Sequence, residues 1–151
     1  DSAGNILPFI PGEEPKIETE PLKILGRDLA IRSTAVRVPV RHGHLLSIHL
    51  GFEGATPSVN EVSQLLQTFE TPSWMKGCPS ALDKVIKVYD DPMHPQPRLV
   101  EQVGQGMAVH VGRIRGEGPL GISLMALGHN TIRGAVGCAL LNAEVLALHA
   151  N

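Results

Sequence analysis

The stretch MAVHVGRIRGEGPLGISLMAL, residues 107–127, contains two strand-like runs that lie close together in the sequence. Residues 107–115 alternate in polarity as a half-buried strand does, and residues 122–127 form a second short apolar run. The residues between them, 116–119, are Gly, Glu, Gly and Pro, a composition typical of a turn. Neighbouring strands of this kind favour an antiparallel or mixed sheet over the regular strand–helix alternation of a doubly wound nucleotide-binding fold.

The N-terminal third predicts one helix and two strands. Residues 13–25 carry carboxylates in the first helical turn, Pro21 should kink or end this helix, and Gly26 is a natural stop. Residues 29–40 are rich in β-branched residues and predict a strand that lies at a sheet edge or ends at Pro39. The second strand is predicted where apolar and polar residues alternate: Leu46, Ile48, Leu50 and Phe52 against Ser47, His49 and Gly51.

The rest of the chain predicts two more helices and a further short strand. Ser58-Val59-Asn60-Glu61 is a capping box ahead of an apolar pattern with helical spacing, so 58–69 should be helix. Loops over 70–82 and 90–106 flank a strand at 85–89, and the Ala/Leu-rich residues 131–149 predict a closing helix. The predicted fold class is α+β: a mixed, largely antiparallel sheet with helices packed on one face, in one domain segment over 1–151.

Composition excludes several classes of protein. The 151 residues carry a formal net charge of −2, which disfavours a nucleic-acid or anionic-membrane partner. With 42% hydrophobic and 19% charged residues the chain can build a core, and no apolar run approaches the roughly 18 residues of a membrane span. Cys78 and Cys138 cannot form a disulfide scaffold, which suits a cytoplasmic protein. Because the chain begins with Asp1, we expect this end to have been cut, processed or set by cloning.

Three histidines, His42, His44 and His49, cluster around one turn. A metal pair at His42 and His44 is one interpretation, because alternate strand residues point the same way, but no third ligand is obvious. Solvated turn histidines are a second. The third is a single general acid/base, His44, held at the start of a strand.

A few other residues suit a ligand or substrate. Arg37 is either an exposed strand arginine or a clamp for a carboxylate or phosphate. Glu13 and Lys16, three apart on the predicted helix, form either a weak surface ion pair or part of a site. Asn130 lies at a helix start, where backbone donors could face a ligand. The glycine-rich segments at 104–106 and 134–137 lack the spacing of a dinucleotide fingerprint, and neither cysteine stands out as a nucleophile.

Several motifs, read together and in order, resemble the second half of aspartate-semialdehyde dehydrogenases, in particular their archaeal and fungal branch. They are NILPFI at 5–10, GEEPK at 12–16, KILG at 23–26, RVPV at 37–40, Gly43-His44, GCPSA at 77–81, QPRL at 96–99, VGRIR at 111–115 and ALGHNTIRGA at 126–135. The resemblance implies the substrate-binding and dimerisation domain, with a fold like the C-terminal domain of glyceraldehyde-3-phosphate-dehydrogenase-like enzymes.

This resemblance implies an oxidoreductase that makes aspartate semialdehyde from aspartyl phosphate with NADPH, in the route to lysine, methionine and threonine. By position His44 would be the catalytic acid/base and Arg37 would hold the substrate carboxylate. Glu13 would meet the substrate amino group and Lys16 the phosphate, although Pro21 interrupts their helix. Asn130 would lie against the nicotinamide end of NADP.

The family's nucleotide-binding half and its nucleophilic cysteine lie upstream of the matching segment. We therefore expect this segment alone to be inactive and to bind NADPH poorly. The closing helix 131–149 would pack on the nucleotide-binding half, so in this segment its apolar face should be bare or covered by another copy. The resemblance also implies a homodimer that associates through the sheet.

Three other functions compete with this prediction. A relative with the same fold could reduce an acyl coenzyme A thioester and keep Arg37 for any carboxylate. The chain could be a noncatalytic homodimerisation domain, in which His44 has no chemical role. A metal-binding module at His42, His44 and His49 is the last alternative.

Overall fold

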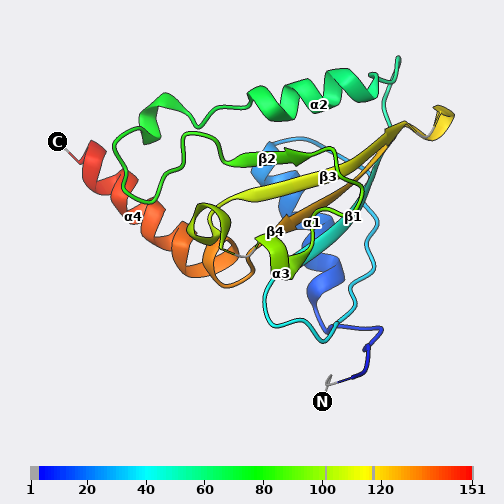
Figure 1. The fold of residues 1–151 in the computed structure, drawn as a ribbon, viewed down its shortest axis with the longest axis horizontal. Helices are drawn as coiled ribbons and strands as arrows, with labels where there is room; N and C mark the ends of the chain where they lie inside the picture. Colours follow the sequence, from blue (N-terminus) through cyan, green and yellow to red (C-terminus); the bar gives the residue numbers. More distant parts are fainter. Residues whose placement is uncertain (1–3, 101, 117, 151) are drawn as a thin grey trace. The chain divides into compact units, whose positions relative to one another are not determined.

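A computed structural model describes residues 4–100, 102–116 and 118–150, and these divide after Arg41 into two compact units. The first contains helix α1 (Glu13–Leu25), and the second contains a sheet with helices α2, α3 and α4 (Figure 1).

Helix α1 has the predicted bounds. Gly12 precedes it with φ of 79°, Glu13 and Glu14 occupy its first turn, and Gly26 ends it in the left-handed conformation with φ of 61°. Pro21 lies inside the helix, which continues to Leu25. The expectation that Pro21 could end the helix is therefore wrong.

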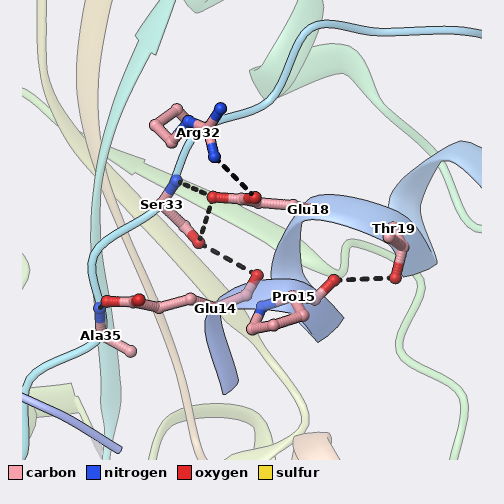
Figure 2. A network of polar contacts seen from close by, with 7 residues as sticks. All are labelled: Glu14, Pro15, Glu18, Thr19, Arg32, Ser33 and Ala35. Carbon is pink, nitrogen blue, oxygen red and sulfur yellow. Dashed lines mark hydrogen bonds and ion pairs between the residues drawn. The ribbon is translucent and has the colours of Figure 1, made fainter. Parts of the chain in front are cut away.

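The predicted strand over residues 29–40 is wrong, because its backbone groups bond to side chains and not to a neighbouring strand. The amide of Ser33 donates to Glu18 Oε1 at 2.9 Å, and the amide of Ala35 donates to Glu14 Oε1 at 3.0 Å (Figure 2). Within this segment the one β-type pairing is an isolated antiparallel bridge between Arg37 and Leu7. A β-branched composition predicts an extended backbone, and this segment meets that requirement without joining a sheet.

Four strands form the sheet of the second unit. They are β1 (His44–Leu50), β2 (Ile86–Tyr89), β3 (Val109–Gly116) and β4 (Ile122–Gly128), in the spatial order β1-β4-β3-β2. The β1–β4 and β3–β4 pairs are antiparallel and the β2–β3 pair is parallel. The α+β fold class with a mixed, largely antiparallel sheet is confirmed.

The strands β3 and β4 are the predicted close pair of runs. Their register shifts between Gly112 and Arg115, and Arg113 has a positive φ of 53° at this bulge. A short 3₁₀ turn, Gly118–Leu120, follows β3. The predicted turn also included Glu117, which lies outside the described residues.

Helix α2 (Val59–Thr68) begins at the predicted capping box. Glu61 N–H donates to Ser58 Oγ, and the Ser58 amide donates to Glu61 Oε2, which lowers the pKa of Glu61. In Figure 1, α2 runs along β2, and it contacts both β2 and β3. Its Leu66 packs with side chains of one sheet face in a cluster centred on Val111, Leu124 and Ala126.

The face of β3 and β4 that points away from α2 is covered by the connection between β2 and β3. That connection contains the short helix α3 (Pro97–Val100) and a 3₁₀ turn at Val103–Gly106. A Cβ on Gly112 would lie 2.4 Å from the carbonyl oxygen of His94, so the backbones approach too closely for any side chain here. A long loop predicted from prolines is thus a cover for the sheet.

The predicted closing helix is present as a π-helical turn, Ile132–Val136, followed by α4 (Gly137–His149). Leu141 is buried against Met107 and Cys78, while Val136, Leu140 and Leu146 are between half and three-quarters exposed. By length and composition alone the helical stretch Ile132–His149 could cross a membrane, although its sequence is not a continuous apolar run. A single helix of this kind is weak evidence for a membrane span.

Candidate functional site

His44 is the first residue of β1, directly after a tight turn. Its backbone pairs with Gly128, the last residue of β4, and its side chain is exposed. The preceding residue, Gly43, donates its amide hydrogen to Asn130 Oδ1 at 3.1 Å. The structure therefore brings together two of the predicted site residues, His44 and Asn130, through one backbone group.

Gly43 is required at this turn. Its φ is 112°, and a Cβ at this position would lie 3.0 Å from Pro97 Cβ and 3.2 Å from Leu127 Cδ1. A side chain would be strained by both the backbone conformation and the contacts. The turn before His44 is thus held by packing against Pro97 of α3 and Leu127 of β4, and by the hydrogen bond to Asn130.

His42, on the other side of Gly43, stacks on His129 with ring centroids 4.9 Å apart. Nδ1 of His129 accepts the backbone N–H groups of Thr131 and Ile132 at 3.3 and 3.2 Å, so the neutral ring carries its proton on Nε2. Nδ1 of His42 is buried without a hydrogen-bond partner among the described residues. The stack fixes both rings, and sequence reasoning assigned no role to His129.

The metal interpretation of the three histidines gains no support from this arrangement. His42 stacks on His129, while His44 and His49 are exposed at the first and sixth positions of β1. Across the described residues no group of three or more His, Cys, Asp or Glu side chains is placed to hold a metal ion.

A small recess lies beside the Gly43 turn, and two buried histidines line it. Its wall consists of Gly43, Pro97, Val100, Gly106, Ala108, His110, Leu127, Gly128 and His129. His110 is 2% exposed, and its Nδ1 lies 2.9 Å from Tyr89 Oη. Burial, with the charge of Lys87 as a lesser cause, lowers the pKa of His110 to about 4, and burial raises the pKa of Tyr89. Both groups are therefore neutral at pH 7.

The other predicted site residues lie in the first unit. Glu13 and Lys16 form an exposed ion pair on α1 at 3.7 Å between Oε1 and Nζ, the arrangement expected of a weak surface pair. Arg37 is exposed, and its backbone N–H and C=O bond to Leu7 at 2.9 and 3.0 Å. Its guanidinium group is thus presented on a fixed stretch of backbone.

The two cysteines contribute to packing. Cys78 is 6% exposed in a cluster with Met107 and Leu141, and Cys138 packs against the same cluster. Both are free thiols. The expectation that Cys138 is packed is confirmed.

The family comparison defines the class of protein. Residues 1–133 match the sequence model of the semialdehyde dehydrogenase dimerisation domain, and the chain belongs to this family. The curated relatives that match this chain are aspartate-semialdehyde dehydrogenases. That of Archaeoglobus fulgidus is 40% identical over 94% of this chain and 43% of its own length, and that of Aspergillus fumigatus is 38% identical over 98% and 45%.

A solved structure agrees. Aspartate-semialdehyde dehydrogenase with NADP from Candida albicans has a TM-score of 0.86 and 39% identity, covering 98% of this chain and 46% of that chain. The chain thus spans about half the length of the curated relatives it matches. The homologues are oxidoreductases, and the match covers their C-terminal part, which confirms the resemblance predicted from the motifs.

Replacing Gly43 with Ala should destabilise the protein by about 2 kcal/mol or more, because the new Cβ meets Pro97 and Leu127 at a positive φ. Urea unfolding measures the change. Gly51→Ala, just past the other end of β1, is the control, since a Cβ there has no neighbour within 4 Å. Equal stability of the two variants would contradict the close packing at Gly43.

His110 should remain neutral down to about pH 4. Its pKa in the folded state lies below the ordinary 6.5, so the unfolded chain binds more protons, and this contribution to stability is lost as the pH falls from about 6.5 toward 4. NMR titration of the His110 ring tests this, and Lys87→Met should raise its pKa slightly. Titration of the ring near pH 6.5 would show that it is not desolvated.

Proposed function

We propose that this chain is the C-terminal, substrate-binding and dimerisation part of an NADP-dependent aspartate-semialdehyde dehydrogenase, acting in the cytoplasm. The reaction is the reduction of aspartyl phosphate to aspartate semialdehyde, with release of phosphate. The observation that carries the proposal is the joint placement of His44 and Asn130 at the Gly43 turn. The proposed reaction needs an acid/base and a residue for the cofactor at the same reacting carbon, and we assign these roles to His44 and Asn130.

His44 is the acid/base of the proposed mechanism. Its ring is exposed at the start of β1, while the backbone on both sides is held by Gly128 and by the Gly43–Asn130 hydrogen bond. A fixed backbone with an accessible imidazole suits proton transfer, since histidine changes charge near neutral pH. In the reaction His44 would take the thiol proton of a cysteine supplied by the nucleotide-binding half, and would handle the proton again at the acyl carbon.

The residues of the first unit would bind the substrate. Arg37 would hold the carboxylate through its planar guanidinium group, which matches a carboxylate with two parallel hydrogen bonds. Glu13 would meet the ammonium group and Lys16 the phosphate. In the present structure Glu13 and Lys16 neutralise each other at 3.7 Å, an exposed pair weak enough for a substrate with both charges to replace.

The side chain of Asn130 fits a role at the nicotinamide end of NADP. Its Oδ1 accepts from Gly43, which leaves the two N–H groups of Nδ2 to donate to a carboxamide oxygen. The dinucleotide, when bound, supplies the reducing equivalent. The chain's own contribution is to present Asn130 at a fixed distance from the backbone of His44.

With a nucleotide-binding half restored on its N-terminal side, the protein should reduce aspartyl phosphate with NADPH. His44→Ala should then lower kcat by about a hundredfold or more, as expected for loss of a general acid/base. Gln64→Ala, exposed on α2 and away from the sheet face proposed for association, is the control and should retain activity. The chain alone should show no turnover.

Three results would count against this assignment. NADPH-dependent turnover by the chain alone would mean that the second half is not needed. Equal activity of His44→Ala and Gln64→Ala would favour a noncatalytic dimerisation domain. Faster turnover of malonyl or succinyl thioesters than of aspartyl phosphate would favour the acyl coenzyme A reductase.

The proposal includes a homodimer formed through the sheet. Leu45, Ser47 and His49 alternate with the cluster residues Leu46 and Ile48, so they occupy the face away from α2, and Leu45 is 48% exposed. An exposed strand face of this kind suits association between copies. It is also consistent with the dimerisation-domain family to which the chain belongs.

Light scattering should give particles of twice the 16.2 kDa chain mass. Leu45→Glu should shift them to the monomer, because the substitution places a charge in the proposed interface. Leu65→Glu on α2, where Leu65 is 71% exposed, is the control and should leave the dimer intact. The proposal that the dimer forms through the sheet would be wrong if the unsubstituted protein were monomeric. It would also be wrong if Leu45→Glu did not weaken the dimer.

A further inference from the structure

Two carboxylates of α1 hold the extended segment that leads to Arg37. Glu14 Oε1 accepts the amide of Ala35 at 3.0 Å, and Glu18 Oε1 accepts the amide of Ser33 at 2.9 Å. The Ser33 hydroxyl donates to the backbone oxygen of Glu14 at 3.2 Å, and Arg32 Nη1 lies 3.2 Å from Glu18 Oε2. Figure 2 shows these contacts as one network between the helix and the segment.

The spacing of the partners explains why the network forms. Glu14 and Glu18 are four residues apart, so both project from one face of α1, about 6 Å apart along its axis. Ser33 and Ala35 are two residues apart in an extended chain, about 6.6 Å, and their amides point the same way. The spacing of the two carboxylates along the helix therefore matches the spacing of the two amides along the segment. The segment runs antiparallel to the helix.

This register directs Arg37 toward the beginning of α1. Ala35 pairs with the earlier of the two glutamates, and Arg37 lies two residues further in the same direction, where its backbone bonds to Leu7. Among the described residues of the first unit, 4–41, only Ala35 is buried. The Glu14 carboxylate thus bonds to the most buried residue of the segment. This bond connects the helix that carries Glu13 and Lys16 to the extended residues that lead to Arg37.

We propose that Glu14 is a positioning residue that sets the place of Arg37 relative to Glu13 and Lys16 through its hydrogen bond to the Ala35 amide. This inference rests on the proposed function, because it deepens the roles given there to these three residues. Glu14 does not touch the substrate in this account. Glu18 and Ser33 secure the other end of the same segment.

The role requires an acceptor oxygen at position 14 and not a negative charge. Arg32 pairs with Glu18, whereas the contact of Glu14 is with a neutral backbone amide. Glu14→Gln keeps an acceptor oxygen at the same reach, and Glu14→Ala removes it and leaves the buried amide of Ala35 unpaired. Glu20→Ala is the matched control, since Glu20 is exposed on the same helix and has no polar partner among the described residues.

Hydrogen exchange on this chain tests the contact itself. Glu14→Ala should speed exchange of the Ala35 amide by about tenfold or more, while Glu14→Gln and Glu20→Ala should leave it close to that of the unsubstituted chain. Unchanged protection of Ala35 in Glu14→Ala would overturn the proposal, and so would equal loss of protection in Glu14→Gln. This measurement needs neither substrate nor cofactor.

Kinetics with the nucleotide-binding half restored test the consequence, in the reverse direction with aspartate semialdehyde, phosphate and NADP. Glu14→Ala should raise KM for aspartate semialdehyde about tenfold, with kcat and KM for NADP little changed, and Glu14→Gln should restore the ordinary KM. An unchanged KM despite faster exchange at Ala35 would overturn the positioning role. Absence of all turnover in the unsubstituted protein would instead count against the proposed function, leaving the exchange result to decide the contact.

Discussion

The close approach of Gly43 to Pro97 and Leu127 determines where β1 begins and therefore where His44 stands. With φ of 112° and a hypothetical Cβ only 3.0 Å from Pro97, the turn has no room for any side chain. Its one free backbone donor is taken by Asn130. The Gly43 amide is hydrogen-bonded and the turn is tightly packed, so the backbone that precedes the exposed His44 side chain is held in place. A site that must move a proton needs this combination of accessibility and order.

The first unit satisfies its backbone in a different way. Every extended segment needs partners for its N–H groups, and a sheet is only one source of them. Here the carboxylates of Glu14 and Glu18 replace a neighbouring strand over Ser33 and Ala35. Each carboxylate places one acceptor oxygen at hydrogen-bond distance from an amide of the segment, so two side chains can hold a segment that elsewhere would need a full strand pairing. At Arg37 the backbone partner is Leu7, through an isolated antiparallel bridge.

Local signals predicted the elements that local chemistry controls. The capping box at Ser58 and Glu61, the Gly26 stop and the two close runs at 107–127 each specify their structure within a few residues, and all three are confirmed. The segment 29–40 failed because composition predicts extension without naming the partner. His110 and His129 were missed as site residues because their burial depends on long-range pairing. The roles of His44, Arg37, Glu13, Lys16 and Asn130 came from ordered motifs, and they stay predictions.

Helix α4 exposes large apolar side chains in the structure of this chain. Leu140 and Leu146 are 54% and 73% exposed, on a helix apolar enough in composition to resemble a membrane span. The hydrophobic effect penalises such a surface in water, so a partner that covers it stabilises the fold and gains affinity from the same contact. The relatives are about twice as long as this chain. Under the proposed function, a nucleotide-binding half that packs on α4 would bury this apolar surface and complete the site in the same contact, so that stability and activity would be gained together.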